Sequence, residues 1–301
     1  MVDLIVAVDD CCPQHSGEHL KMTVTDPRLR VLFHEVNQGV GGATLTGYVA
    51  AMKEGAEILV KMDGDGQMDA QYLSRLLQPL WQRRADFTKG NRFFDLVALR
   101  QMPWVRRVGN FGLTLLTKAA SGYWHISDPT NGYTAVHAAA LRLLNLDRLH
   151  RRYFFETSML IQLNIVRAVA YDVPIPARYG TETSSLQVSR VLMDFPPKLV
   201  GGFCQRLLWR YFIFDVSAVS FLLVCGAALT ASGVGFGSFH WFLAGSRGVN
   251  TDAGTVGIAI MVTIVGIQML LQAVLLDTMD KPLMPLHVLV DDRMPGNLRR
   301  P

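Results

Sequence analysis

The sequence predicts an α/β domain with a mostly parallel sheet, followed by an amphipathic interface helix and two C-terminal transmembrane helices. Two patterns lead to this prediction. Short apolar runs typical of buried strands alternate with helical segments through residues 1–190, which is the order expected of a parallel sheet. Further along, two long segments contain no Asp, Glu, Lys or Arg, which favours helices that cross a bilayer.

Each element of the domain has a local signal. β-branched and apolar residues mark the strands, and longer runs of small and apolar residues mark the helices. The expected strands are residues 2–8, 30–34, 56–62 and 87–89, and the expected helices are residues 39–51 and 72–82.

Acidic residues follow two of these strands. Asp9 and Asp10 end the first strand, and Asp63 and Asp65 come directly after the third. The carboxyl ends of parallel strands meet at one edge of a sheet, where such folds bind their ligands. We therefore expect these carboxylates to converge on one site.

The second acidic pair has the composition of a metal site. Asp63 and Asp65 are separated by one glycine, and Gln67 is two residues further on. Carboxylate and amide oxygens suit a hard divalent cation such as Mn²⁺ or Mg²⁺, which would offset the charge of a diphosphate leaving group. The alternative is a surface turn, because Asp and Gly are common turn residues. The position directly after an apolar strand favours the metal site.

The two uncharged segments are residues 216–246 and 254–276. The second has 23 residues and would form a helix of about 34 Å, enough to cross a hydrocarbon core of about 30 Å. We expect the first to leave the membrane through its glycine-rich stretch 233–237, with Trp241 and Phe242 at the interface. The alternative, two buried core helices, is disfavoured by these lengths.

Basic residues flank the two spans, whereas the loop between them contains only Arg247. The positive-inside rule then places both ends in the cytosol, as expected for a multi-pass protein of the cell (inner) membrane with a cytosolic N-terminal domain. Residues 191–211 mix Arg206 and Arg210 with large apolar side chains, so we expect an amphipathic helix on the membrane surface. The spans would fall within 212–280 and a cytosolic tail within 281–301.

Composition excludes other classes. The net charge is +4 without dense runs of Lys or Arg, so no nucleic-acid partner is expected. The four cysteines have the spacing of neither a disulfide framework nor a zinc site, which favours a reducing compartment. Met1 leads directly into a strand-like run, so no signal peptide is expected.

Seven motifs occur in a specific order: VDD, NQGVGGA, KMDGDGQ, KGNRF, SDPTNGYTA, YFFETSML and VPIPARYG. In this order they resemble the family-2 glycosyltransferases, in particular the polyprenyl-phosphate sugar synthases, over residues 2–190. The resemblance implies a GT-A fold. It also implies inverting transfer of a single sugar from a nucleotide-sugar donor to a polyprenyl phosphate at the membrane.

The resemblance assigns the donor site. It implies that Asp9 or Asp10 holds the nucleotide, and that Asp63, Asp65 and Gln67 bind the metal and the sugar diphosphate.

The resemblance also assigns an acceptor-phosphate site. Arg92, Arg106 and Arg178 match its arginines, and Asn110 stands where the family has a hydroxyl residue. Three guanidinium groups would hold a phosphate nucleophile beside the anionic donor.

Catalytic roles are expected for Asp65, Arg92 and Asp128. For Asp128 an organising role is favoured over that of a general base, because a phosphate acceptor is already ionised near neutral pH. Glu156 is expected to pair with an arginine or to lie on a helix surface.

The family's usual first strand, which ends in a Pro-x-Tyr-Asn-Glu-like turn, has no counterpart in this sequence, so we expect a sheet without it. Two alternatives stay open. One is a membrane glycosyltransferase with another glycan or lipid acceptor, and the other is a non-catalytic membrane-anchored scaffold. No motif sets the sugar, the nucleotide, the lipid, or whether the protein is a homo-oligomer.

Overall fold

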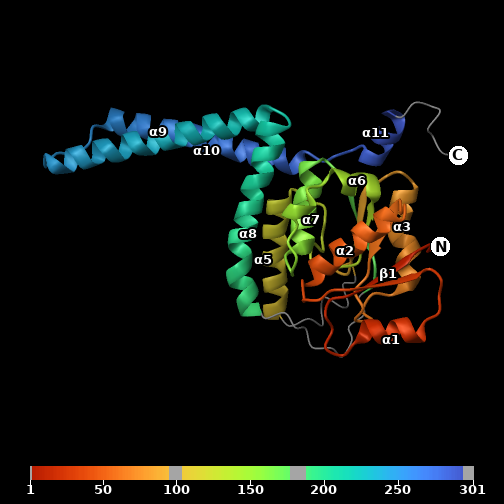
Figure 1. Cartoon of the computed structure of the whole chain (residues 1–301). Helices are drawn as coiled ribbons and strands as arrows, with labels where there is room; N and C mark the ends of the chain where they lie inside the picture. The colour runs from red at the N-terminus through yellow and green to blue at the C-terminus, as the bar shows by residue number, and fades with distance from the viewer. Residues whose placement is uncertain (1, 95–103, 177–187, 294–301) are drawn as a thin grey trace. The chain divides into compact units, whose positions relative to one another are not determined.

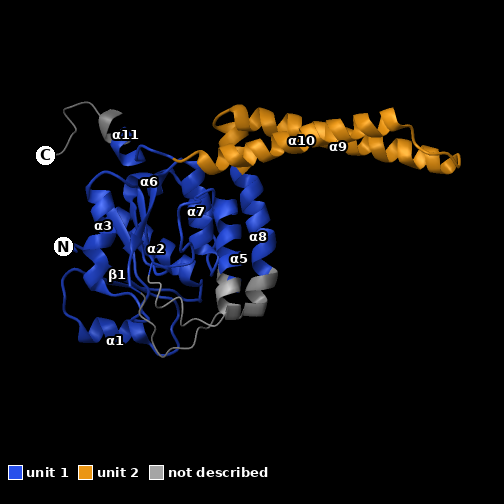
Figure 2. Cartoon of the chain, turned by 180° about the vertical axis from the view of Figure 1, so that it is seen from behind, with its two compact units in different colours: residues 1–206, 282–301 blue, residues 207–281 orange. Residues whose placement is uncertain are grey.

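The computed structural model describes residues 2–94, 104–176 and 188–293 (Figure 1). The chain forms two compact units, one of residues 1–206 with 282–301 and one of residues 207–281 (Figure 2).

Strands and helices alternate through most of the first unit. Its elements are β1 (Ile5–Asp9), α1 (Ser16–Thr23), β2 (Leu29–Phe33), α2 (Val40–Lys53), β3 (Ile58–Lys61), η1 (Ala70–Tyr72), α3 (Leu73–Trp81), β4 (Phe87–Asn91), α5 (Trp104–Ser121), β5 (Thr134–His137), α6 (Ala138–Leu143), η2 (Leu146–Arg148), α7 (Phe155–Ile165), β6 (Ala170–Pro174), α8 (Val188–Leu208) and α11 (Leu286–Arg293). The strands and helices expected up to residue 91 are confirmed, with ends that shift by a few residues.

The strands form two sheets, and the expectation of a mostly parallel sheet is confirmed only in part, because β5 runs against the other strands of its sheet. β1 pairs in parallel with β2 in a two-stranded sheet. The second sheet has the order β3-β5-β4-β6, in which β5 is antiparallel to both β3 and β4, while β4 and β6 are parallel. The sequence reading missed β5, so it could not detect the strand that reverses direction.

The reversed strand has a consequence for the site. Lys61 at the end of β3 pairs with Thr134 at the start of β5. The loop that leads into β5 therefore lies at the same edge of the sheet as the carboxyl ends of β3 and β4. A parallel β5 would have placed that loop, which contains Asp128, at the opposite edge.

The four-stranded sheet separates two apolar clusters. On one face, Leu59 and Phe87 pack with Tyr48 of α2 and Leu160 of α7. On the other face, Ala135 and Val173 pack with leucines of α3. Because side chains alternate along a strand, Lys61 and Lys89 share the face of Leu59 and Phe87 and point toward the α7 side.

α11, the last helix in the described part of the chain, is held within the first unit by Asp86, whose side chain is fully buried. The Asp86 carboxylate accepts hydrogen bonds from the backbone N–H groups of Val169, Leu286 and His287 at 2.9, 2.9 and 3.1 Å, and it lies 2.9 Å from His287 Nδ1. The His287 ring also stacks on His137, with 4.4 Å between ring centroids. A buried carboxylate with this many partners ties the start of α11 to β4 and β6.

The second unit is a pair of long helices, α9 (Ala218–Ser246) and α10 (Ala253–Met279), preceded by the π-helix η3 (Trp209–Ile213). Both helices are long and apolar enough to cross a membrane. At their base, Tyr211 Oη donates to Asp277 Oδ1 at 2.6 Å, and Arg210 pairs with Asp280 at 2.7 Å. These polar contacts fix η3 to the end of α10.

The glycine-rich stretch does not interrupt α9, which continues as a helix to Ser246. Where the first span leaves the membrane stays a prediction. The expectation for the basic residues that precede the span is wrong. Arg206 and Arg210 are buried rather than exposed on a basic face. Arg206 donates to the carbonyl oxygens of Ala119 and Ala120 at the end of α5, and these carbonyls attract cations because they end a helix.

Glycines bring α9 and α10 into close contact instead. A Cβ at Gly266 would lie 2.4 Å from the backbone N of Thr230, and one at Gly226 would lie 3.0 Å from the carbonyl O of Gly266. Small residues at such crossings let two helix backbones approach within a membrane.

We expect Gly266→Leu to weaken the α9–α10 packing by about 1–3 kcal/mol, because the added side chain has no room between the helices. Thermal unfolding of the full chain in detergent measures the effect. Gly257→Leu is the control on the same helix, because a Cβ there meets no heavy atom within 4 Å. Equal unfolding temperatures for the two variants would contradict this packing.

Candidate active site

The carboxylates after β1 hold two loops in place. Asp9 accepts from the N–H groups of Cys12 and Gly17, each at 2.7 Å. Asp10 accepts from the N–H groups of Gln38 at 2.8 Å and Gly39 at 2.7 Å, and lies 2.7 Å from His34 Nδ1. Asp10 thereby orders the turn that leads into α2.

The pKa of Asp10 reflects these contacts. Burial alone would raise the pKa, but the hydrogen bonds from Gln38, His34 and Gly39 outweigh it, so the pKa is lowered. Asp10 is therefore an anion at neutral pH, held by donors of the protein itself.

The turn after β3 presents two different carboxylates. Asp65 is exposed, and its Oδ1 accepts from the N–H of Gln67 at 3.0 Å. Asp63 is half-buried, and its Oδ1 lies 2.6 Å from Lys61 Nζ. Gly66 has a φ of +72°, a left-handed conformation that glycine adopts readily.

Lys61 joins three parts of the chain. Its side chain is only 4% exposed, and its ammonium contacts Asp63 at 2.6 Å and Glu156 of α7 at 3.3 Å. The carbonyl oxygen of Gly132 lies 3.5 Å away. A buried ammonium needs such partners, so Lys61 holds the β3 turn, α7 and the loop before β5 together. The expected arginine partner of Glu156 is replaced here by a lysine.

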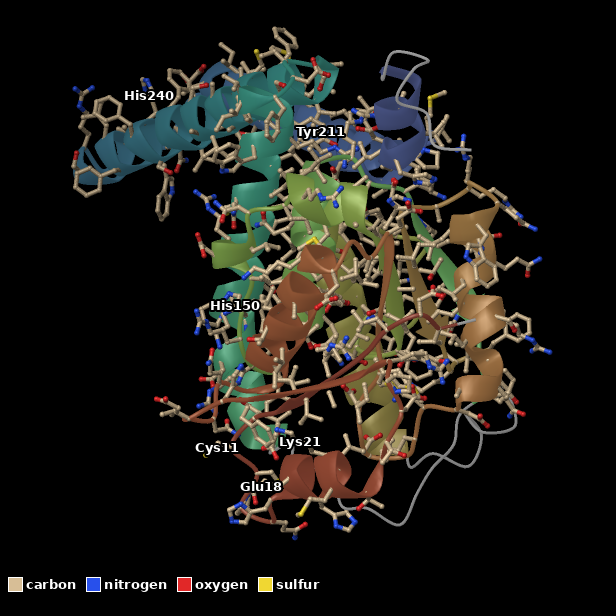
Figure 3. The ribbon with its side chains drawn as sticks, turned by 45° about the vertical axis from the view of Figure 1, so that its right-hand side comes forward. Cys11, Glu18, Lys21, His150, Tyr211 and His240 are labelled. Carbon is tan, nitrogen blue, oxygen red and sulfur yellow. The ribbon has the colours of Figure 1, made fainter. Side chains whose placement is uncertain are left out.

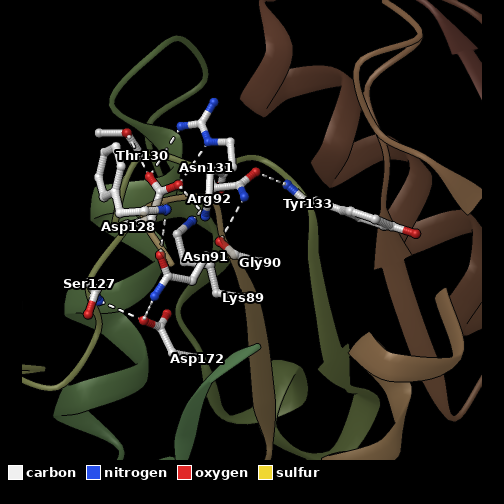
Figure 4. A network of polar contacts seen from close by, with 11 residues as sticks. Lys89, Gly90, Asn91, Arg92, Ser127, Asp128, Thr130, Asn131, Tyr133 and Asp172 are labelled. Carbon is white, nitrogen blue, oxygen red and sulfur yellow. Dashed lines mark hydrogen bonds and ion pairs between the residues drawn. The ribbon is translucent and has the colours of Figure 1, made fainter. Parts of the chain in front are cut away.

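Arg92 and Asp128 form a two-pronged ion pair at the end of β4 (Figure 4). Arg92 Nε and Nη2 donate to the two carboxylate oxygens at 2.8 and 3.2 Å. The backbone N–H of Arg92 and the hydroxyl of Thr130 also donate to Asp128, at 3.2 and 3.3 Å. Asp128 is fully buried, while the Arg92 side chain stays 36% exposed. This geometry fixes the guanidinium on a buried carboxylate that accepts from several donors, which suits an organising carboxylate better than a general base.

A second set of hydrogen bonds, to Asp172, joins the residues next to this ion pair. Asn91 Nδ2 and the N–H of Ser127 both donate to Asp172 Oδ2 of β6, at 2.9 and 2.8 Å (Figure 4). Burial raises the pKa of Asp172, with a further contribution from Asp128. The contacts join β4, β6 and the loop before β5.

Lys89 lies in the interior of the domain and contacts the loop before β5. It is fully buried, and its ammonium donates to the carbonyl oxygen of Asn131. Burial lowers the pKa of Lys89 to about 8, although Glu156 and Asp128 act in the opposite direction.

The structure brings several of the predicted residues to one edge of the four-stranded sheet. Asp63 and the loop of Asp128 meet through Lys61 and Gly132, and Arg92 pairs with Asp128. Asp9 ends β1 of the two-stranded sheet, and Asp10 follows it directly. Their roles in binding and catalysis stay predictions.

Less of the predicted acceptor-phosphate site lies within the described part of the chain. Arg178 lies outside the described residues. Arg106 and Asn110 belong to α5, but their side chains lie outside the part of the chain that is described.

The β3 turn has a donor set that fits a hard cation. Asp63, Asp65 and Gln67 supply oxygen atoms from one short turn, two of them half-buried and one exposed, as Mg²⁺ or Mn²⁺ prefers. Among the described residues, no group of three or more His, Cys, Asp or Glu side chains is arranged as a metal site. A cation here would thus need further oxygen ligands from solvent or substrate.

Sequence reasoning missed Lys61, Lys89 and Asp172. Each is a charged residue in a strand that is otherwise apolar or neutral, in the strands ILVK, FTKGN and AYDVP. A charge within a buried strand has to be paired. That signal would have identified all three as side chains that need polar or charged partners.

Comparison with known proteins identifies relatives. Residues 2–144 match the model of "Glycosyl transferase family 2". The UDP-N-acetylglucosamine–dolichyl-phosphate N-acetylglucosaminyltransferase of Methanococcus voltae is 33% identical over 162 residues, which is 54% of this chain and 64% of the relative. An uncharacterized protein of Methanocaldococcus jannaschii is 30% identical over 191 residues, or 64% of this chain and 76% of the relative. The undecaprenyl-phosphate mannosyltransferase of Micrococcus luteus is 29% identical over 173 residues, or 57% of this chain and 70% of the relative.

The lowered pKa of Lys89 predicts a pH dependence of stability. Between pH 8 and about 10.5 the unfolded chain binds more protons at this residue than the folded chain, so the free energy of unfolding rises with pH. Below pH 8 both states are protonated, and the full penalty of burying the ammonium is present.

We expect Lys89 to raise the free energy of unfolding by an amount on the order of 3 kcal/mol between pH 8 and about 10.5, at about 1.4 kcal/mol per pH unit. Denaturant unfolding of the full chain in detergent at several pH values measures it, and Lys89→Met should lack it. Parallel pH profiles for the natural chain and the variant would exclude an ammonium with a lowered pKa at this position.

Proposed function

This chain belongs to glycosyltransferase family 2, and from that premise we propose that it transfers a single sugar from a nucleotide-sugar donor to a polyprenyl phosphate, with inversion, on the cytosolic face of the cell membrane. The observation that carries the proposal is the edge of the sheet where Asp63, Asp65, Arg92 and Asp128 gather. The names of two relatives, which act on dolichyl-phosphate and undecaprenyl-phosphate, support the acceptor class.

The reaction proposed for this edge is an in-line displacement. A phosphate oxygen of the acceptor attacks the anomeric carbon and forms a new C–O bond, while the bond from that carbon to the donor diphosphate breaks. The electron pair leaves with the nucleoside diphosphate. No strong base is required, because the acceptor phosphate is already an anion. The main task of the protein is to hold two anions close together.

Separate groups of residues would bind the metal, the nucleotide and the acceptor phosphate. Asp63, Asp65 and Gln67 would hold Mn²⁺ or Mg²⁺, which would stabilise charge on the leaving diphosphate. Asp9 and Asp10 would hold the nucleotide. Arg92, oriented by Asp128, would hold the acceptor phosphate, together with Arg106 and Arg178 from outside the described side chains.

Two features support the proposed membrane orientation. Both ends of the α9–α10 pair lead into the same compact unit, since α8 precedes the pair and the segment with α11 follows it. Two crossings would therefore return the tail to the side of the domain. Lys198 and Lys281 flank the pair and only Arg247 lies between the helices, which favours the cytosol for that side.

Membranes that contain the full chain, incubated with polyprenyl phosphate, Mn²⁺ and a panel of labelled nucleotide sugars, test the function. Label should enter the lipid phase from one donor, and Asp65→Ala should lower this transfer by at least about 100-fold because an anionic ligand of the diphosphate site is lost. Asp147→Ala is the control, because Asp147 is an exposed carboxylate on η2. Equal transfer by both variants would reject the assignment of the β3 turn.

The Arg92–Asp128 pair gives a second prediction. Asp128→Asn keeps the shape of the side chain but removes its charge, so Arg92 loses its fixed orientation. We expect kcat/KM for the polyprenyl phosphate to fall by about 10- to 100-fold, mainly through a higher KM for that acceptor.

Thr130→Val is the matched control, because it removes only the 3.3 Å hydrogen bond to Asp128. It should have a much smaller effect. An equal rise in KM for donor and acceptor in Asp128→Asn would show that this carboxylate does not act through acceptor binding.

A further inference from the structure

Asp172 of β6 is a half-buried carboxylate that the proposed reaction does not use. Burial raises its pKa, and the hydrogen bond from the N–H of Ser127 offsets this effect only in part. Removing a carboxylate from water costs free energy unless donors compensate for it. The donors that Asp172 serves therefore indicate what it does.

The pairing of β4 with β6 decides where this carboxylate lies. Asp172 is the register partner of Lys89, and Asn91 lies two residues further along β4. Side chains alternate along a strand, so Lys89 and Asn91 project from the same face of the sheet. Asp172 projects from that face as well, since Ala170, two residues earlier, packs in the apolar cluster there. Asp172 thus meets the Asn91 side chain at the carboxyl end of β4.

One oxygen of Asp172 holds the residue that precedes each member of the Arg92–Asp128 ion pair. Oδ2 accepts from Asn91 Nδ2 at 2.9 Å and from the N–H of Ser127 at 2.8 Å (Figure 4). Asn91 directly precedes Arg92, and Ser127 directly precedes Asp128. The same atom therefore joins the end of β4 to the loop before β5, next to the ion pair that bridges them.

The Asn91 side chain extends this support past the arginine. Its Oδ1 accepts from the N–H of Phe93 at 2.9 Å, while its Nδ2 donates to Asp172. The backbone on both sides of Arg92 is in this way connected to the carboxylate of β6.

The loop that carries Asp128 is held at both ends. Ser127 is held by Asp172, and at the other end Asn131 Nδ2 donates to the carbonyl oxygen of Gly90 at 2.7 Å. Asp128 lies between these two anchors, so loss of either one would free the carboxylate that orients the guanidinium.

We propose that Asp172 is a positioning residue for the acceptor phosphate, acting through the Arg92–Asp128 pair rather than on a reactant. The inference rests on the proposed function, in which Arg92 binds the phosphate of a polyprenyl phosphate. A guanidinium makes two parallel hydrogen bonds to a phosphate only when its orientation is correct, and small displacements of such a group lower the rate strongly.

Steady-state kinetics of sugar transfer by the full chain test the proposal. Asp172→Ala removes the oxygen that both donors share, so KM for the polyprenyl phosphate should rise by about 10-fold while KM for the nucleotide sugar stays within about 2-fold. Asp172→Asn retains one oxygen, which can accept from both donors as Oδ2 does, and should bring the acceptor KM back to within about 2-fold of the natural chain.

Two control variants separate this role from general effects. Thr88→Val removes another buried hydrogen bond of β4, from Thr88 Oγ1 to the carbonyl oxygen of Leu76 at 2.8 Å, and measures the effect of weakening the sheet alone. Glu18→Gln removes one negative charge at an exposed position of α1 (Figure 3), and measures the effect of net charge on an anionic acceptor. Both variants should leave the two KM values unchanged.

Hydrogen exchange of the full chain in detergent measures the positioning without any reactant. The backbone N–H of Arg92 donates to Asp128 at 3.2 Å. This N–H should exchange at least about 10-fold faster in Asp172→Ala than in the natural chain, whereas Thr88→Val should change its exchange by less than about 2-fold. If Asp172→Ala does not fold, Asn91→Ala breaks one of the two hydrogen bonds and should raise the acceptor KM by about 3-fold.

Several outcomes would overturn the proposal: an unchanged acceptor KM in both Asp172→Ala and Asn91→Ala, an equal rise for donor and acceptor, the same rise in Thr88→Val, or no recovery in Asp172→Asn. If the natural chain transfers no sugar to polyprenyl phosphate, the proposed function fails instead. The exchange of the Arg92 N–H then decides whether Asp172 holds the ion pair in place.

Discussion

The need to neutralise two buried ammonium groups organises the first unit. Lys61 ends β3 and Lys89 lies within β4, on one face of the sheet with β5 between them, and both side chains are almost entirely removed from water. Their partners come from separate segments: the β3 turn, α7, and the loop before β5. A buried ammonium without these partners would be strongly destabilising. The sheet can therefore fold correctly only if the segments that carry these partners are also in place.

The sequence predicted the parts of this domain that depend on local pattern. Strands such as β1 and β3 were visible because β-branched and apolar residues precede the acids directly. The direction of β5 was not predictable in this way, because the segment TAVH is too short to show a pattern of its own, and pairing direction is a long-range property. Its reversal explains why Asp128 lies beside Arg92 rather than at the far edge.

In the α9–α10 pair, too, the local features were predictable from the sequence and the long-range contacts were not. Length and absence of charge identified both helices, since these properties are local. The role of the glycines depends on contacts between the two helices: Gly226 and Gly266 are needed because the backbone of the other helix lies against them. Without that contact in view, a glycine-rich segment suggests a break in the helix. Arg206 and Arg210 were likewise read as surface charges, although their partners lie at the ends of α5 and α10. Composition cannot distinguish a basic residue that faces lipid headgroups from one that caps a helix.

The contact between Asp86 and His287 has a consequence for the biogenesis of the protein. α11 is translated only after both apolar helices, yet its first residues supply donors to a carboxylate in the core of the domain. Domains generally fold as they emerge during synthesis. This one stays incomplete on the ribosome until the helix pair has been made, so synthesis of that pair precedes the final closure of the domain.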